Sequence, residues 1–64
     1  MKPIWIELID THGKKVIVNA CLIEYFRTSS RDKDITYVSF GNEHLIGVKH
    51  TVEELRSIID KATD

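Results

Sequence analysis

Residues 51–55, with the sequence TVEEL, mark the point at which a strand-like chain becomes helical. Thr51 is a favourable helix N-cap, and the Glu54 side chain can accept a hydrogen bond from the Thr51 backbone N–H, so that the pair forms a capping box. Apolar residues then recur at helical spacing, which predicts one amphipathic helix over residues 52–62. Its apolar stripe consists of Val52, Leu55, Ile58, Ile59 and Ala62. Because about a dozen residues make only a marginal helix in water, this helix depends on docking its stripe against the rest of the chain.

The chain before the capping box has the pattern of short strands separated by turns. Runs of alternating and β-branched apolar residues predict five strands, at residues 4–9, 15–20, 22–27, 35–40 and 44–48. Residues 10–14 form a hairpin turn in which Gly13 can take a positive φ, and residues 41–43 form a second turn. Asn19 is a poor strand residue and marks a bend, while Gly47 is a weak point in the last strand.

The elements and the length together predict a single small domain over residues 1–64. We expect the α+β class, with an antiparallel β-meander of about five short strands and one C-terminal α-helix packed on a face. Hydrophobic residues make up 42% of the chain and charged residues 30%, which is a globular rather than a disordered composition. A core of this size rarely contributes more than about 3–5 kcal/mol of net stability, so we expect a homodimer to stabilise the fold.

The first strand is apolar on both faces, which indicates a second contact surface. Ile4, Ile6 and Leu8 point to one side, while Trp5 and Ile9 point to the other. The helix can cover only one face, so a second copy of the chain is the simplest partner for the other, with Trp5 as its anchor. The alternative is that the sheet curls into a half-barrel and buries both sets internally. The residues expected at the interface are Trp5, Ile4, Ile6, Ile9, Tyr25 and Tyr37.

The charge and the cysteine content bear on the compartment and the partners. A formal net charge of −1 gives no electrostatic reason to expect a polyanion partner. The one cysteine, Cys21, cannot form an internal disulfide, which fits a reducing compartment, so we expect a cytoplasmic location. The apolar run at residues 3–6 ends at Glu7 and is far shorter than the ~18 apolar residues of a membrane span, so we expect no membrane insertion.

No arrangement of reactive side chains in the sequence predicts an enzyme. His12, His44, His50 and Cys21 match no zinc-binding spacing, so we expect neither a metal nor another cofactor. The apolar neighbours of Cys21 indicate a small, half-buried hydrophobic residue rather than a nucleophile. The carboxylates are scattered along the chain, and Glu54 is explained by its place at the start of the helix.

Nucleic-acid binding is the alternative from another class of function, because small β-sheets with aromatic residues can stack unpaired bases. The aromatic candidates are Trp5, Tyr25, Tyr37 and Phe40, and the candidate cations are Lys14, Lys15, Arg27, Arg31, Lys33 and Lys49. Against this reading, Asp32 and Asp34 neutralise the loop cations, and aromatic residues in strands are more often core or interface residues. A single-stranded nucleic-acid-binding or transcription-associated module is therefore the less favoured hypothesis.

Once the strands are placed, a series of short motifs becomes visible along the chain. In order, they are His12-Gly13-Lys14-Lys15, Val18-Asn19-Ala20, Leu22-Ile23-Glu24, Ile35-Thr36-Tyr37-Val38 and the capping-box segment TVEEL. With these motifs the chain resembles, over residues 4–62, the small FlbD/SwrD family of flagellar and swarming-motility proteins. The resemblance implies a non-enzymatic accessory protein that acts through protein–protein contacts with an unknown protein partner. A role in motility is implied by the resemblance alone.

Overall fold

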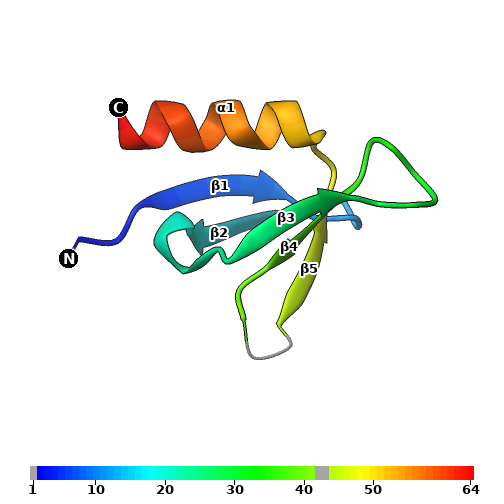
Figure 1. Cartoon of the computed structure of the whole chain (residues 1–64), viewed down its shortest axis with the longest axis horizontal. Helices are drawn as coiled ribbons and strands as arrows, with labels where there is room; N and C mark the ends of the chain where they lie inside the picture. Colours follow the sequence, from blue (N-terminus) through cyan, green and yellow to red (C-terminus); the bar gives the residue numbers. More distant parts are fainter. Residues whose placement is uncertain (1, 42–43) are drawn as a thin grey trace.

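The computed structural model describes residues 2–41 and 44–64 of the chain (Figure 1). The strands are β1 (Trp5–Ile9), β2 (Lys15–Asn19), β3 (Tyr25–Thr28), β4 (Thr36–Ser39) and β5 (Leu45–Val48). A short 3₁₀ turn, η1 (Ala20–Leu22), separates β2 from β3, and the helix α1 (Val52–Thr63) follows β5. The predicted α+β class is confirmed, and the bounds agree with expectation to within one residue except in the third strand. Of the predicted turn at residues 41–43, Asn42 and Glu43 lie outside the described residues.

The strands form two antiparallel sheets rather than one continuous meander. β1 pairs with β2, while β3, β4 and β5 form a three-stranded sheet in that order. The sheets meet at the C-terminal ends of β1 and β5, where Asp10 and Val48 form a bridge and the Lys49 N–H donates to the Ile9 carbonyl at 2.7 Å. Counted across this junction, the strand order is β2-β1-β5-β4-β3. The last strand of the chain, β5, therefore lies next to the first strand, β1.

The third strand begins at Tyr25 rather than at Leu22, because Asn19 turns the chain. The Asn19 Oδ1 accepts hydrogen bonds from the Cys21 N–H at 3.0 Å and from the Ile4 N–H at 3.1 Å. These bonds cap η1 and hold its start against the beginning of the first strand. The predicted bend at Asn19 is confirmed, and the predicted start of the third strand was wrong for the same reason.

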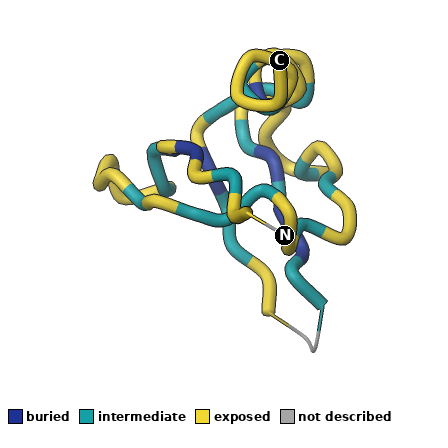
Figure 2. The backbone as a smooth tube through the Cα atoms, turned by 90° about the vertical axis from the view of Figure 1, so that its left-hand side faces the viewer, coloured by how far each residue is buried: buried dark blue, intermediate teal, exposed yellow. Residues whose placement is uncertain are grey.

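The core lies between the two sheets and beneath α1. Its buried residues are Ile6, Leu8, Val38, Val48 and Leu55. The predicted alternation in β1 is confirmed, because Ile6 and Leu8 are buried while Trp5 is exposed. In Figure 2 the exposed residues follow the outer side of the helix, the turns and the loops, around a small buried centre. In the half-barrel alternative both faces of the first strand are buried. Ile6 and Leu8 are buried, but the exposure of Trp5 contradicts this alternative.

The helix α1 packs against β1 and β3 and is started by the capping box predicted from the sequence. The Glu54 N–H donates to Thr51 Oγ1 at 3.1 Å, and the Thr51 N–H donates to Glu54 Oε1 at 2.9 Å. Leu55 is fully buried, and Ile58 and Ile59 pack against the core. Ala62, expected on the same stripe, is exposed in the last turn of the helix.

His50 connects β1, β4 and the start of α1. Its Nε2 accepts a hydrogen bond from the Ile9 N–H at 3.0 Å, and its carbonyl accepts one from the buried Thr36 hydroxyl at 2.6 Å. An imidazole nitrogen can accept a hydrogen bond through its ring lone pair, and this is the role of Nε2 here. A residue immediately before the capping box thus satisfies a strand N–H that lies 41 positions earlier in the chain.

Replacing His50 tests this junction. His50→Phe keeps a ring of similar size but removes the acceptor, which leaves the Ile9 N–H without its partner. We expect the free energy of unfolding to fall by about 1–3 kcal/mol in urea denaturation. The matched control is His44→Phe, at an exposed position, which should change stability by less than about 0.5 kcal/mol. Equal stability of the two variants would show that the imidazole acceptor is not needed.

The capping box predicts a specific dependence on pH. The hydrogen bonds from the Thr51 backbone and side chain hold the pKa of the Glu54 carboxyl below its ordinary value. A carboxyl whose pKa is lowered on folding stabilises the protein above its ordinary pKa of about 4 and loses that contribution as the pH falls further. Glu54→Gln can keep the capping geometry without titrating.

The stability difference between the wild type and Glu54→Gln should therefore be largest near neutral pH and shrink as the pH falls below about 4. Urea unfolding midpoints at several pH values measure this difference. Glu53→Gln is the control, since Glu53 lies in the same turn but makes neither bond of the capping box. A wild-type advantage over Glu54→Gln that stays constant down to pH 3 contradicts the interpretation.

Candidate interaction surfaces

Among residues 2–41 and 44–64 the reactive side chains do not assemble into a site. In the described part of the chain no pocket is found, and no group of three or more His, Cys, Asp or Glu side chains could hold a metal ion. Cys21 is exposed, which corrects the expectation of a half-buried residue, because η1 turns it outward beside the Lys2 carbonyl. No helix among the described residues is long and apolar enough to cross a membrane. The surface features that remain are the outward faces of the two sheets.

The outward side of the β1–β2 hairpin carries two large apolar side chains. We call Trp5, Glu7, Lys15 and Ile17 the hairpin face. Trp5 is 62% exposed and Ile17 is 59% exposed. In the register of the hairpin, Ile17 lies opposite Glu7 and Asn19 opposite Trp5, so Trp5 and Ile17 are diagonal neighbours. Lys15 Nζ lies 3.6 Å from Glu7 Oε1, in an exposed ion pair that contributes little to stability.

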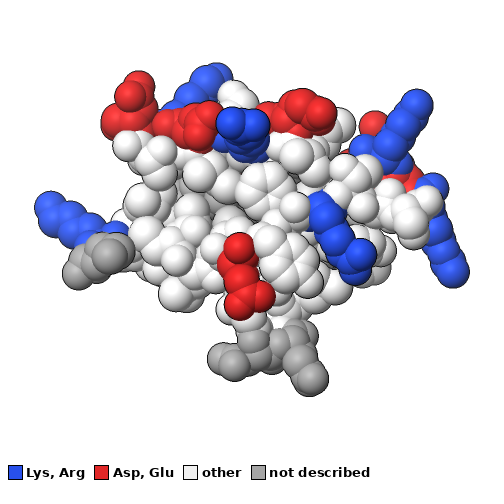
Figure 3. Space-filling model, viewed as in Figure 1, with Lys and Arg blue, Asp and Glu red and all other residues white. Residues whose placement is uncertain are grey.

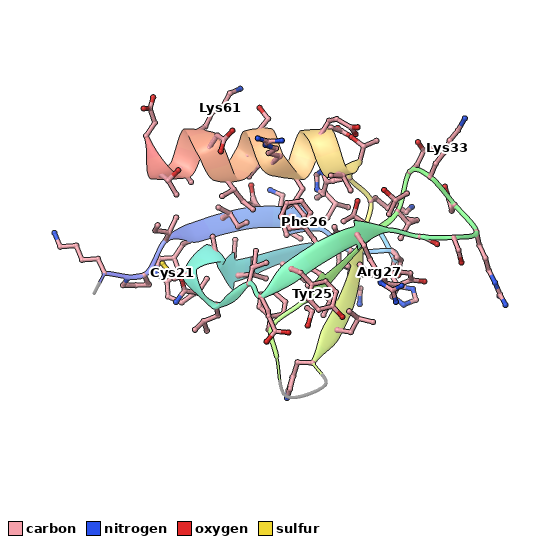
Figure 4. The ribbon with its side chains drawn as sticks, viewed as in Figure 1. Cys21, Tyr25, Phe26, Arg27, Lys33 and Lys61 are labelled. Carbon is pink, nitrogen blue, oxygen red and sulfur yellow. The ribbon has the colours of Figure 1, made fainter. Side chains whose placement is uncertain are left out.

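The outward side of the three-stranded sheet carries a different set of side chains. We call Tyr25, Arg27, Tyr37 and Leu45 the sheet face. Arg27 lies directly opposite Tyr37, and Tyr25 lies two residues before Arg27 on the same strand. Figure 4 shows Tyr25 and Arg27 on the same side of β3, whereas Phe26 points toward α1. Tyr25 is 49% exposed and Leu45 is 47% exposed.

The Tyr37 ring is held in place by Gly47 and by the turn of the hairpin. A Cβ atom at Gly47 would lie 3.0 Å from Thr11 Cγ2 and 3.4 Å from Tyr37 Cε1. The absence of a side chain at Gly47 therefore lets the tyrosine ring and the threonine methyl approach the strand together. β5 pairs residue by residue with β4 through Gly47, so the strand is regular at the position that the sequence marked as a weak point. The glycine is there because Thr11 and Tyr37 fill the space of its side chain.

The residues expected at one interface fall into three places. Trp5 lies on the hairpin face, whereas Tyr25 and Tyr37 lie on the sheet face. Ile6 is only 4% exposed and belongs to the core, so it is removed from any interface. Ile4 and Ile9 are half-buried, and Ile4 packs against the core. The candidate residues therefore do not share one surface, and which of them form an interface stays a prediction.

Three exposed apolar residues were missing from the expected surface. They are Ile17, Leu22 and Leu45. Ile17 could have been found from the sequence, because Val16 and Val18 face the core and alternation then turns Ile17 outward. The exposure of Leu22 could not have been found from the sequence, because it depends on the 3₁₀ turn η1.

Charged groups collect at the end of the molecule where the strands meet the hairpin turn and the β3–β4 loop. In Figure 3 charged atoms mark the helix and this loop, and one acidic and one basic side chain also lie on the otherwise uncharged middle of the visible face. Asp10 belongs to the hairpin turn, where its Oδ1 accepts from the N–H groups of His12 and Lys14, each at 2.9 Å. These bonds, led by the one from Lys14, lower the pKa of Asp10. Gly13 has the positive φ predicted for this turn, 81°.

The contact at Gly47 can be tested with a double-mutant cycle. Gly47→Ala places a methyl group against Thr11 and Tyr37, and we expect it to lower the free energy of unfolding by about 1 kcal/mol. Thr11→Ser removes the Cγ2 methyl that is closest to the new atom. The loss caused by Gly47→Ala should therefore be smaller in the Thr11→Ser background, with a coupling of about 0.5 kcal/mol or more. Strictly additive effects would show that the two residues do not share this space.

Comparisons with the models of known families, with curated proteins and with solved structures found no match for this chain. The two outward faces are therefore interpreted from their own chemistry and geometry.

Proposed function

We propose that the chain is a small, non-catalytic accessory protein that acts through protein–protein contacts, and that the hairpin face pairs with a second copy. The observation that carries the proposal is the exposure of Trp5 and Ile17, diagonal neighbours on the same face of the hairpin. The resemblance to the FlbD/SwrD proteins supports the same kind of role, and with it a cytoplasmic setting and a link to motility.

Apolar burial supplies the driving force for such a contact. Removing an exposed isoleucine from water contributes about 1.5–3 kcal/mol, and a tryptophan at the centre of an interface is a common energetic hot spot. The small core of this chain leaves these side chains in water in the monomer. Pairing the hairpin faces would bury both of them without any change in the fold.

The hairpin face is also complementary to itself. In a two-fold dimer each surface patch meets its own copy, so acid and base must both be present on one patch if the charges are to pair across the interface. Glu7 and Lys15 provide one of each between the apolar residues. Across the two-fold axis, Trp5 can pack on Ile17 of the second copy while Glu7 approaches its Lys15.

Light scattering tests self-association directly. We expect a mass of twice the 7.4 kDa chain at high micromolar concentration. Trp5→Ala should shift the population toward the monomer, and Ile17→Lys should shift it further, because it adds a second cation beside Lys15. Both positions are exposed, so circular dichroism should show an unchanged fold.

Tyr25→Ala is the matched control, since it removes an exposed aromatic ring from the other face. This variant should remain dimeric. A wild type that stays monomeric at high micromolar concentration contradicts self-association. A dimer that survives Trp5→Ala and Ile17→Lys places the interface elsewhere.

A further inference from the structure

The sheet face has an arrangement that the protein-contact role does not use. Tyr25 and Arg27 alternate on β3, and Tyr37 stands opposite Arg27 on β4. Directly opposed residues in antiparallel strands have Cβ atoms about 4.5–5.5 Å apart, so two aromatic rings and a guanidinium group form one continuous surface. The Thr11 methyl group and the Tyr37 ring share the space that Gly47 leaves beside the strand. The sheet face therefore presents an exposed tyrosine, Tyr25, and a half-buried one, Tyr37, together with the exposed Arg27.

The strand pairing brings further cations to one end of the sheet face. Thr28 pairs with Thr36, Thr36 with Val48, and Val48 with Asp10, so the β3–β4 loop, the end of β5 and the hairpin turn lie together. These segments carry exposed basic residues: Lys14, Arg31, Lys33 and Lys49. Arg27 adds a fifth cation from the sheet face itself.

The acids at the same end are fewer, and two of them are engaged in holding turns. Asp10 accepts two backbone N–H bonds in the hairpin turn, and Asp32 accepts the Asp34 N–H at 2.9 Å. Glu53 and Glu54 begin α1, which packs on the core side of the sheet, away from the sheet face. In the loop Asp32 and Asp34 offset Arg31 and Lys33, so the excess of positive charge at this end comes from Lys14, Lys49 and Arg27 against Asp10. Glu24, which precedes Tyr25, lies at the opposite end of β3.

We propose that the sheet face binds single-stranded nucleic acid. Unpaired bases stack on Tyr25 and Tyr37, Arg27 contacts a base plane or the phosphate beside it, and the backbone continues toward the basic residues of the loop and the hairpin turn. A flat surface cannot enter the grooves of a duplex, so the occupant has unpaired bases. This binding is independent of the dimer, because the hairpin face lies on the other sheet.

The test uses the full chain and a fluorescein-labelled oligothymidylate of about 12 nucleotides, a length within the range that small single-strand binding domains cover. Fluorescence anisotropy at 50 mM salt should show saturable binding, and the affinity should fall by about 7–20-fold at 200 mM salt if two to three phosphates are contacted. A duplex of the same length should bind at least tenfold more weakly.

Three variants separate stacking from general charge. Tyr25→Ala should weaken binding about tenfold, whereas Tyr25→Phe, which keeps the ring, should bind within about twofold of the wild type. Arg27→Ala should weaken binding and lower its dependence on salt. Arg56→Ala is the matched control: it removes the same charge from the exposed side of α1 and should leave the affinity unchanged.

Trp5→Ala distinguishes this proposal from the dimer, since it should abolish pairing and leave the affinity per chain unchanged. The inference is overturned by an absence of binding at 50 mM salt, by equal affinity for duplex and single strand, or by binding that Tyr25→Ala does not weaken. Each of these results leaves the self-association proposal standing, because that proposal is measured by mass and not by oligonucleotide binding.

Discussion

The hydrogen bonds of His50 join the two sheets at the corner where their backbones meet, beside the core that both sheets enclose. The hairpin and the three-stranded sheet touch at the ends of β1 and β5, where the ladder between them is a single bridge supported by the bond from Lys49 to Ile9. His50 closes this corner by accepting the Ile9 N–H through its ring and the Thr36 hydroxyl through its carbonyl. The capping box begins at the next residue, so the same corner fixes the direction in which α1 crosses β1 and β3. The contact between the two sheets and the start of the helix therefore meet at this one corner.

The two sheets and the helix enclose only a small core of few fully buried side chains. The size of this core explains why large apolar side chains remain exposed on the surface. Each strand turns about half of its residues outward, and among the described residues no further layer covers the outward faces of the two sheets. Trp5 and Ile17 are therefore exposed on one sheet, and Tyr25 and Leu45 on the other. The exposure is a consequence of chain length and topology, and the side chains placed there give each face its own chemistry.

Local sequence patterns predicted the strands and the helix well. The features that these patterns missed depend on contacts between residues far apart in the sequence. Alternation correctly turned Leu8 inward and Trp5 outward, and the capping box located the start of α1. The Asn19 side chain, by contrast, bonds a residue 15 positions away, and that bond converts the expected start of a strand into η1. The acceptor role of His50 depends on a separation of 41 positions, and no local spacing reports it. Because the strands divide into two sheets at η1, the candidate interface residues Trp5 and Tyr25 lie on different sheets.

The separation of the two faces gives a geometric reason for combining them. In the proposed dimer the hairpin faces meet at the two-fold axis, and the sheet faces, which lie across the core from them, point outward on both copies. A nucleic-acid strand long enough to span the dimer would then meet two identical sheet faces, and the second contact would be intramolecular with a high effective concentration. A surface of two tyrosines and one arginine is weak by itself, so a chain this small gains most from presenting it twice. The proposed self-association and the proposed strand binding would in this way be complementary uses of surfaces that the small core does not bury.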